Sequence, residues 1–492
     1  MTEGKSDPSK SDRVIVIGGG LSGLAAAYRI YERAGTMRRP VALTVLEAKE
    51  RLGGVISTDR FDGFAVEGGP DSFITNKAWG IDLCDRLGLT DQLVETESSH
   101  RRSFVVCKGR LVPVPEGFVL MAPHRLLPIL TTPILSWRGK LRFLMDLVIP
   151  RHNDDEGEES LGSFVRRRLG REALDRLVQP LVAGIYTADP NDLSLKATLP
   201  QFLAMERDHG SLIRAAWRES RHRGTRHLLR HASGARYGMF VTLAEGMDTL
   251  PSALARALPP GSVRTGTSVR RISRNEPVSP WLVELLDGPP LEADAVIVAT
   301  EAHAAARFLD TQDPALALQL RSIPYASSLI VNIAYRRDQI SHPLDGFGAV
   351  VPAIEGRSIL AVSFLSVKFP NRAPAGTVLL RVFMGGAGRP EQLDLDDAAI
   401  TALVERELAG LIGAAGDPLF VRIGRHPRSM PQYNLGHLDR VASIRRNLAK
   451  YSRLYLAGIA YDGVGIPDCI HAAEMTADRL IDALANPAAS AA

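Results

Sequence analysis

Three glycines near the start of the chain follow the spacing G-x-G-x-x-G, at Gly18, Gly20 and Gly23. Each has a distinct use if a phosphate-bearing ligand lies against the backbone. Gly18 permits a tight turn, Gly20 lets the main chain approach a pyrophosphate with no Cβ in the way, and Gly23 lets a helix pack closely on a strand. The chemistry that this spacing indicates is the binding of a dinucleotide.

Such glycines work only between a strand and a helix, and the sequence predicts both. The apolar run Val14–Ile17 is typical of a strand buried on both faces. The alanine-rich stretch 24–33 predicts a helix whose first N–H groups and partial positive charge would face the phosphates. A second apolar run, 41–46, ends on Glu47, whose carboxylate can accept hydrogen bonds from ribose hydroxyls. An acid at that position would repel a 2′-phosphate, which argues against an NADP-type ligand.

Two more glycine segments follow within 25 residues of Glu47. Gly53 and Gly54 could bring backbone close to a cofactor, with Arg51 neutralising a phosphate; a surface turn with a solvated arginine explains them equally well. The next segment, Gly68-Gly69-Pro70-Asp71-Ser72, ends a hairpin-like stretch and could place N–H groups near a planar ring.

A second strand, glycine loop and helix occur at the far end of the chain. The apolar run 454–458 ends on small residues, the loop 461–468 contains Gly463 and Gly465, and a helix is expected from Cys469. The run 294–300 predicts another buried parallel strand. Two nucleotide-type loops at opposite ends of the chain imply one discontinuous domain, and this joint pattern is more specific than either loop alone.

The middle of the chain has other patterns. Residues 80–235 are expected to be mostly helical, with an amphipathic segment over Leu161–Leu177. The apolar stretch 117–150 is interrupted by prolines and carries arginines. This composition suits a helical lobe around an apolar pocket, while a contact with a membrane interface is left open. A strand is expected over 262–272, and four runs predict an antiparallel sheet in a second lobe: 328–335, 348–351, 359–364 and 378–384.

Composition sets wider bounds. A chain of 492 residues is too long for one compact core, so two or three lobes are expected. The net charge of +4 is mild for this size, and no basic stripe with interleaved aromatics indicates nucleic acid. Cys84, Cys107 and Cys469 are widely spaced, which favours a reducing cytoplasm. The polar start of the chain, residues 1–13, is unlike a secretory signal, and no apolar run is long enough to predict a membrane span.

The glycine fingerprint, Glu47, the run from Arg51 to Gly54 and Glu67-Gly68-Gly69-Pro70 resemble the FAD-binding half of the flavin amine oxidase and phytoene desaturase superfamily. Within it, the chain most resembles the oxygen-dependent porphyrinogen oxidases, which comprise protoporphyrinogen oxidases and the coproporphyrin-forming coproporphyrinogen III oxidases. The resemblance implies an α/β fold with three parts: a discontinuous Rossmann-like FAD-binding domain (11–95, 239–303 and 445–484), a helical lobe that could face a membrane (96–208), and an antiparallel-sheet substrate domain (209–238 and 304–444).

The same resemblance implies the residues that hold FAD. They lie in the glycine loops at both ends of the chain, next to Glu47, and on the strand whose Val269 would meet the adenine through its backbone. The expected set is Gly18, Gly19, Gly20, Leu21, Ser22, Gly23, Glu47, Ala48, Arg51, Gly54, Val55, Gly69, Pro70, Asp71, Ser72, Val269, Ile459, Val464, Gly465 and Ile466.

Four residues are expected to contact the substrate, each with an ordinary alternative. Gly184 would let a backbone carbonyl reach the ligand, or it caps a helix before a turn at Asp189 and Pro190. Phe347 and Val350 would sandwich a flat macrocycle, or they are core residues. Arg102 would meet a substrate propionate, or it is simply solvated.

The implied reaction is the oxygen-dependent, six-electron oxidation of a porphyrinogen to a porphyrin in haem biosynthesis. The soluble-looking, basic chain favours coproporphyrinogen III, which has four carboxylates, over the greasier protoporphyrinogen IX. The expected partners are the porphyrinogen and molecular oxygen, with no nucleic acid. The expected location is the cytoplasm, while attachment to the inner face of the membrane and a homodimer are left open.

Other functions remain open at this point. An amine oxidase or a carotenoid desaturase would use the same fold, and a flavin-binding scaffold would need no reaction at all. No pattern indicates a metal site, a nucleophile or a general base, so no catalytic residue is named. His303, His426, His437 and His471 are scattered, and each is expected to be exposed or hydrogen-bonded.

Overall fold

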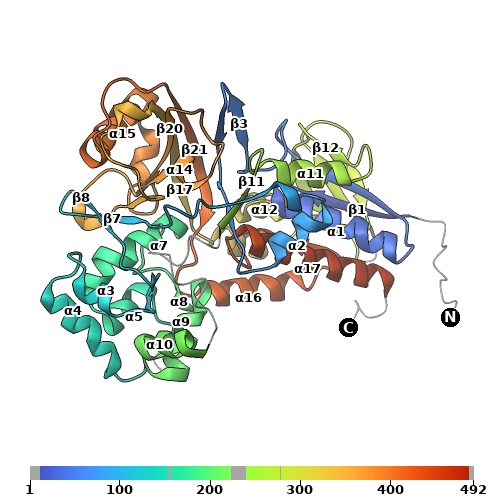
Figure 1. Cartoon of the computed structure of the whole chain (residues 1–492). Helices are drawn as coiled ribbons and strands as arrows, with labels where there is room; N and C mark the ends of the chain where they lie inside the picture. Colours follow the sequence, from blue (N-terminus) through green and yellow to red (C-terminus); the bar gives the residue numbers. More distant parts are fainter. Residues whose placement is uncertain (1–10, 153–156, 223–239, 278, 487–492) are drawn as a thin grey trace.

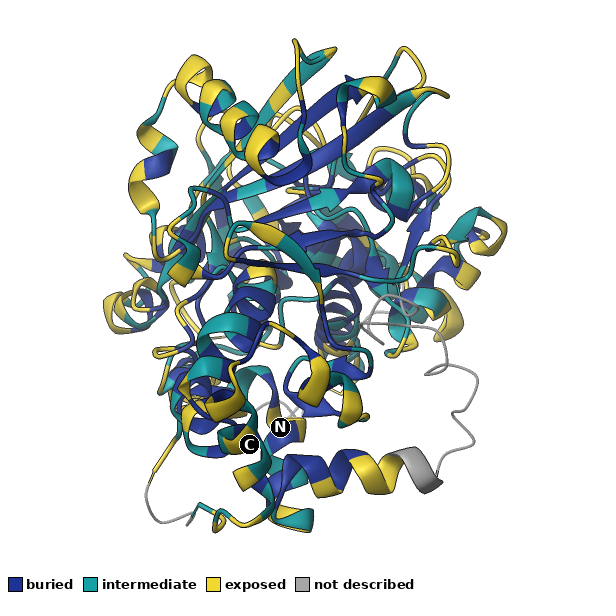
Figure 2. Cartoon of the chain, turned by 60° about the vertical axis from the view of Figure 1, so that its left-hand side comes forward, coloured by how far each residue is buried: buried dark blue, intermediate teal, exposed yellow. Residues whose placement is uncertain are grey.

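The computed structural model describes residues 11–152, 157–222, 240–277 and 279–486. The stretch 223–239, most of which was predicted for the substrate domain, lies outside these residues. Buried residues fill the middle of the molecule, between exposed helices and loops (Figure 2). Among the described residues, no helix is both long and apolar enough to cross a membrane.

A five-stranded parallel sheet joins three distant parts of the chain. Its order is β12 (Val263–Arg264), β2 (Val41–Leu46), β1 (Asp12–Ile17), β16 (Ala295–Val298) and β22 (Leu454–Leu456). β1 lies in the middle of this sheet, and its residues from Val14 to Ile17 are buried there, as the apolar run predicts. The sheet confirms a discontinuous Rossmann-like domain.

Two helices from opposite ends of the chain cover this sheet together. α1 (Leu21–Thr36) and α17 (Ile466–Ala485) lie side by side (Figure 1). Arg29 pairs with Asp478 at 2.9 Å and Arg33 with Asp482 at 3.1 Å, so both helices run in the same direction. Both begin three residues earlier than expected, because the glycine loops lead straight into helix and Pro467 fits a first helical turn.

Smaller elements surround the parallel sheet. The strand expected over 262–272 is in fact two strands, β12 and β13, because Gly266 adopts a left-handed conformation with φ of +60° between them. β13 (Val269–Ser273) pairs with β14 (Trp281–Leu285), which pairs with β15 (Leu291–Ala293). The other elements here are β3 (Thr58–Phe61), β4 (Phe64–Glu67), β5 (Phe73–Ile74), β6 (Leu93–Glu95), β11 (Phe240–Leu243), α2 (Trp79–Arg86), α11 (Thr249–Ala257), α12 (Ala302–Leu309), α13 (Pro314–Arg321) and α16 (His437–Leu448).

A seven-stranded sheet forms the second lobe. Its order is β21 (Phe420–Pro431), β17 (Tyr325–Arg336), β20 (Thr377–Gly385), β19 (Ala361–Phe364), β18 (Gly348–Val350), β7 (Phe104–Cys107) and β8 (Arg110–Pro113). All neighbours are antiparallel except β18 and β7. α15 (Asp397–Ile412) packs on one face, and α14 (Leu365–Lys368) follows β19. β7 and β8 were predicted for the helical lobe but belong to this sheet. We therefore propose that the helical lobe begins after Pro113.

The remaining helices form the third lobe (Figure 1). The amphipathic segment 161–177 is not one helix, because Gly170, with φ of +95°, ends α5. After it, α6 continues into a π-helical turn, η4, and then α7. The bounds are β9 (Phe118–Val119), β10 (Ala122–Pro123), α3 (Leu127–Thr131), α4 (Trp137–Leu144), η2 (Met145–Leu147), α5 (Leu161–Arg168), α6 (Arg171–Ala173), η4 (Leu174–Val178), α7 (Gln179–Tyr186), α8 (Leu195–Thr198), α9 (Pro200–His209) and α10 (Leu212–His222).

Candidate functional site

The first glycine loop joins β1 to α1, and its three motif glycines differ in their surroundings. A Cβ on Gly18 would lie 2.7 Å from the carbonyl oxygen of Ala299, and one on Gly23 would lie 1.8 Å from that of Gly18. Packing within the protein therefore explains these two. A Cβ on Gly20 would meet only the Cα of Gly54, at 3.8 Å, and its φ of −74° suits any residue. Its backbone is open to a ligand, which fits close approach of a pyrophosphate.

Glu47 lies against this loop. One carboxylate oxygen accepts a hydrogen bond from Gly19 N–H at 2.7 Å, and the other accepts one from Lys49 N–H at 2.8 Å. Ala48 next to it is exposed. These bonds fix the carboxylate at the end of β2, where an acid could still accept from a ribose.

The second glycine loop packs on the first. Gly53 N–H donates to the carbonyl of Gly19 at 2.8 Å, which brings Gly54 next to Gly20. Arg51 donates to three carbonyls of its own loop, those of Leu52, Gly54 and Ile56. Arg51 therefore holds this loop closed, and its contact with a phosphate stays a prediction. Val55 is largely exposed at the tip of the loop.

The C-terminal loop lies beside the first glycine loop. A side-chain hydrogen bond joins Ser22, in the first turn of α1, to Cys469, in the first turn of α17. The residues before these helices, Gly20 and Gly465, provide no side-chain cap. Two helix N-termini therefore present free N–H groups at one place, which suits the anionic part of a dinucleotide.

The rest of the C-terminal loop is tied down by Tyr433. Its hydroxyl donates to the carbonyl of Ile459 at 2.7 Å and accepts from Gly463 N–H at 2.7 Å. Val464 is half-buried against the helical lobe. Val269 is also half-buried, and the backbone N–H of Thr267, two residues before it, donates to the carbonyl of Glu47 at 2.8 Å. The residues predicted to hold FAD therefore come together from four parts of the chain.

Asp71 of the third glycine segment and four buried charged side chains near it form a group that we call the cradle cluster: Glu67, Asp71, Lys368, Arg372 and Arg381. Lys368 Nζ lies 2.9 Å from Asp71 and Arg381 lies 3.4 Å from it. Arg381 also donates to the carbonyl of Gly69. The cluster fixes the segment from Gly69 to Ser72, whose hydroxyl accepts from Lys368 at 3.1 Å.

The electrostatics of the cradle cluster are unbalanced. Burial would raise the pKa of Asp71, but the charges of Lys368 and Arg381 outweigh it and hold that pKa well below its usual range. Burial raises the pKa of Glu67, and the Thr58 hydroxyl and Arg372 offset only part of this. Burial lowers the pKa of both Arg372 and Arg381. With two acids and three bases, the cluster carries an excess positive charge next to the glycine loops.

Several buried polar atoms in this area have no hydrogen-bond partner among the described residues. They are Oδ1 of Asn332 and Nε of Arg372 and Arg381. The other amide atom of Asn332 donates to the carbonyl of Glu67 at 3.1 Å, and His426 Nε2 lies 2.9 Å from that of Gly68. Unpartnered polar groups, excess positive charge and the open Gly20 together fit a bound anionic dinucleotide.

The four predicted substrate residues form two pairs: Gly184 on α7 with Val350 on β18, and Arg102 with Phe347, which shortly precede β7 and β18. A Cβ on Gly184 would lie 4.0 Å from Cγ1 of Val350. Gly184 is exposed within the last turn of α7, and the cap is Thr187, so the helix-cap alternative for Gly184 is wrong. Phe347 is 2% exposed, and its N–H donates to the carbonyl of Arg102 at 2.8 Å. Arg102 is not free in solvent, because its guanidinium pairs with Asp345.

The expectation that each histidine is exposed or hydrogen-bonded is wrong for His437. This side chain is fully buried, neither ring nitrogen has a partner among the described residues, and the ring stacks on Tyr433 at 3.9 Å. Burial lowers the pKa of His437 to about 4. It therefore supports, as a neutral ring, the tyrosine that holds the C-terminal loop.

The sequence prediction missed Lys368, Arg372, Arg381, Asn332 and Tyr433. Two of them left a signal: Arg381 interrupts the apolar run 378–384, and Asn332 interrupts the run 328–335. A single polar residue inside an apolar strand indicates a buried polar contact. The other three left none, since their partners are distant in sequence.

Comparisons with known proteins agree with this geometry. Residues 21–481 match the family described as flavin containing amine oxidoreductase. The chain is 35% identical to coproporphyrinogen III oxidase of Bacillus subtilis, covering 96% of this chain and 97% of that one. It is 36% identical to coproporphyrinogen III oxidase of Propionibacterium freudenreichii, covering 96% and 91%.

Among solved structures, a candidate protoporphyrinogen oxidase from Exiguobacterium sp. 255-15 has a TM-score of 0.83 and 32% identity, covering 96% of this chain and 99% of that one. Matches of this length span both glycine loops and all three lobes. The chain therefore belongs to the flavin-containing amine oxidoreductase family, as an FAD-dependent oxidoreductase.

Proposed function

We propose that this protein oxidises a porphyrinogen to a porphyrin in haem biosynthesis, with coproporphyrinogen III as the substrate and molecular oxygen as the acceptor. The two bacterial relatives that support this choice are named coproporphyrinogen III oxidase and match nearly the whole chain. Protoporphyrinogen IX is the alternative, favoured by the Exiguobacterium structure.

The observation that carries the proposal is the meeting of the two glycine loops, from opposite ends of the chain, beside an open Gly20. FAD, when bound, accepts the hydride and passes electrons to oxygen. The residues predicted from the sequence would hold it: the N-termini of α1 and α17 at the pyrophosphate, Glu47 at the ribose, and the segment from Gly69 to Ser72 near the ring.

The remaining work of the chain is to place the substrate and exclude water. Gly184 and Val350 would contact the macrocycle from α7 and β18. A propionate could reach Arg102 only by replacing Asp345, which now neutralises that guanidinium. No side chain is proposed as a general base, because formation of the aromatic macrocycle drives the reaction.

The substrate is tested by adding each porphyrinogen to the FAD-loaded protein without oxygen, then admitting air. We expect coproporphyrinogen III to bleach the flavin absorbance, and air to restore it with formation of coproporphyrin III. Faster turnover of protoporphyrinogen IX would reverse the substrate choice. Bleaching by neither would leave a flavin-binding scaffold or an oxidase of another substrate, which a panel of amines and carotenoids would identify. Sedimentation of the same sample gives its oligomeric state.

The cofactor site is tested with Gly20→Val. Its φ suits valine and its Cβ would clash with nothing, so the variant should fold. The side chain would occupy the place of the pyrophosphate, and we expect the protein to be colourless. Gly35→Ala is the matched control, since it lies on the same helix with nothing near its Cβ. A yellow Gly20→Val variant with normal flavin content would refute the pyrophosphate assignment.

A contact with the membrane surface is part of the proposal. Large apolar side chains on α3 and α4 are exposed: Leu127 (72%), Trp137 (67%) and Leu141 (57%). Arg138 lies beside Trp137, as suits an anionic interface. We expect the protein to sediment with phosphatidylglycerol vesicles, and Trp137→Ser with Leu141→Ser to weaken this. Leu286→Ser, on an exposed leucine elsewhere, is the control; equal sedimentation of all three would exclude this surface.

A further inference from the structure

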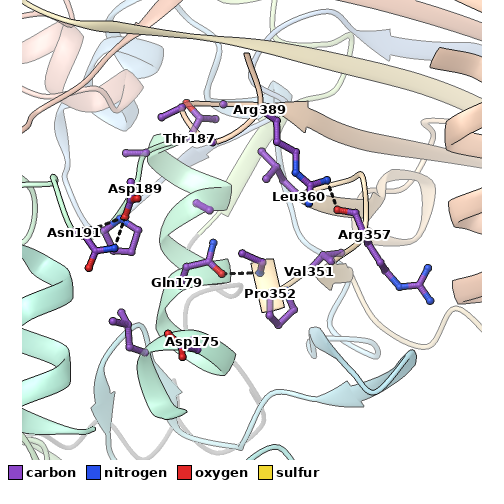
Figure 3. Close-up of a pocket in the computed structure, with 18 of the residues that line it drawn as sticks. Asp175, Gln179, Thr187, Asp189, Asn191, Val351, Pro352, Arg357, Leu360 and Arg389 are labelled. Carbon is purple, nitrogen blue, oxygen red and sulfur yellow. Dashed lines mark hydrogen bonds between the residues drawn. The ribbon is translucent and has the colours of Figure 1, made fainter. Parts of the chain in front are cut away.

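A cavity of about 520 Å³ lies between the helical lobe and the ends of strands β18, β19 and β20 of the seven-stranded sheet (Figure 3). One wall is the face of α7 and η4 that carries Leu174, Gln179 and Ala183. The opposite wall is formed by the segments 351–353, 359–360 and 385–389. Its volume is in the range of small-molecule sites. Its lining includes Ala183 and Val351 but neither Gly184 nor Val350, so it lies next to the predicted substrate contact without sharing its residues.

The backbone around this cavity is unusual at three separate places. Leu174 begins the π-helical turn. Such turns are rare in proteins overall, and many of those that occur lie at functional sites. Thr187 has φ of +49°, which is strained for a β-branched residue. Gly386, with φ of +80°, approaches so closely that a Cβ would lie 3.1 Å from the carbonyl oxygen of Thr187. Such strain tends to persist where a site must keep a particular shape.

The charged side chains of the cavity are not all neutralised. Arg357 pairs with Glu407 at 2.8 Å. Among the described residues, no carboxylate pairs with Arg389, which donates to the carbonyl of Arg357, or with Arg166, which donates to Asn191. In Figure 3, Asn191 lies at the left of the cavity and Arg389 at its upper right. Because Arg166 donates to Asn191, the two cations belong to different sides of the cavity.

The surface between these cations is mostly apolar. Val351, Ile359 and Leu360 line the sheet side, facing Ala183 and Leu174 on the helical side. Polar residues also line it: Gln179 already accepts a hydrogen bond from Ala353 N–H at 3.0 Å, and Asp175 pairs with Arg171 at 3.4 Å. Asp189 is likewise occupied by Asn191. A ligand that fits has a broad apolar body with carboxylates at both ends.

We propose that this cavity is a second tetrapyrrole site, which binds the porphyrin carboxylates through Arg166 and Arg389. The identity of the ligand depends on the proposed function, whereas the site itself depends only on the cavity. A fatty acid has an apolar body with one carboxylate and would use one of the two arginines. A tetracarboxylate porphyrin would use both.

The experiment is a titration of the FAD-loaded protein with coproporphyrin III, followed by fluorescence anisotropy. We expect two molecules to bind per chain, and one after Arg166→Gln with Arg389→Gln. Each single change should weaken the second site about ten-fold, since one charge-assisted hydrogen bond is lost. Arg336→Gln, on an exposed arginine at the end of β17, should leave two sites.

A steric variant tests the same site without changing charge. Ala353→Trp would fill the cavity from an exposed position, while its neighbour Ile354 is exposed outside the lining and gives the control Ile354→Trp. One coproporphyrin per wild-type chain that the charge and Ala353→Trp variants still bind, or two bound to those variants, would overturn the proposal. The proposal would also be overturned if laurate competed with coproporphyrin III equally well for the second site and if each of the two arginine changes weakened laurate binding.

The results separate this proposal from the proposed function. A protein that binds two porphyrins but oxidises no porphyrinogen keeps the site and loses the reaction. A protein that oxidises porphyrinogen but binds one porphyrin in every variant keeps the reaction and loses the site.

Discussion

Two buried ionic clusters, one in the helical lobe and one at the cofactor loops, differ in how completely their hydrogen bonds are made. In the helical lobe, Arg168 and Asp146 are both fully buried and lie 2.6 Å apart. Every guanidinium nitrogen of Arg168 donates, and both oxygens of Asp146 accept, including from Ser211 and Ile213 N–H. Glu206 adds a second acid at 3.3 Å.

The cradle cluster is mostly buried, but its hydrogen bonds are incomplete. Arg372 and Arg381 each keep a nitrogen without a partner among the described residues, and Asn332 beside them keeps an oxygen. A fully satisfied cluster rigidifies the helices around it, whereas an incomplete one is tolerated where another group completes it. We propose from this difference that the first cluster stabilises the fold and that the second would have its hydrogen bonds completed by the cofactor.

The largest expected effect is from Asp146→Ala. Removing one partner of a buried pair leaves Arg168 as an uncompensated charge, and the free energy of unfolding should fall by about 3–5 kcal/mol. Urea denaturation followed by circular dichroism measures this. The flavin content of the folded protein should be unchanged.

The matched control is Asp310→Ala, which breaks a surface pair with Arg321 at 2.7 Å and should change stability by less than about 1 kcal/mol. If Asp146→Ala instead released flavin without loss of stability, the division of roles between the clusters would be wrong.

The next effect is a dependence on pH through His437. Its pKa in the folded protein is lowered to about 4, so the folded state prefers the neutral ring. This contribution to stability is complete above the unfolded pKa of about 6.5 and is lost as pH falls toward 4, amounting to about 3 kcal/mol. Flavin release measured between pH 7 and 4.5 should therefore be steeper for the wild type than for His437→Phe, which keeps the stacking on Tyr433. Parallel curves would show that protonation of His437 is not the cause.

The glycine loops could be predicted from the sequence because their rules are local. Gly18, Gly20 and Gly23 act within one strand–turn–helix unit, and the apolar runs beside them predict strands of the parallel sheet. The cradle cluster follows no such rule, since Asp71 and Arg381 are 310 residues apart in the sequence. Thr187 and the π-helical turn could not be predicted either, because tertiary packing imposes both conformations. The ion pair between Arg102 and Asp345 could not be predicted for the same reason, because Asp345 is distant in sequence but adjacent in space.

A smaller effect is expected from Arg381→Met. The change removes a charge whose desolvation already lowers its pKa, so part of the lost pairing with Asp71 is offset. We expect the free energy of unfolding to fall by about 1–3 kcal/mol and FAD to bind at least ten-fold more weakly. Equilibrium dialysis of FAD measures the second quantity. Arg422→Met, on β21 of the same sheet and mostly exposed, is the control; equal FAD affinity in both variants would remove the cofactor role from the cluster.

The smallest effect on stability is expected from Asn332→Leu. The amide oxygen has no partner among the described residues, so its removal relieves a buried polar atom, while one hydrogen bond to the carbonyl of Glu67 is lost. These terms oppose each other, and the free energy of unfolding should change by less than about 1 kcal/mol. The corresponding change in the complete cluster, Ser211→Ala, takes one hydrogen bond from Asp146 with no relief and should lower stability by about 1–3 kcal/mol. FAD affinity should respond in the reverse order, falling for Asn332→Leu and staying unchanged for Ser211→Ala. If both variants lost stability equally and neither changed FAD binding, an incomplete cluster would be no guide to the cofactor site.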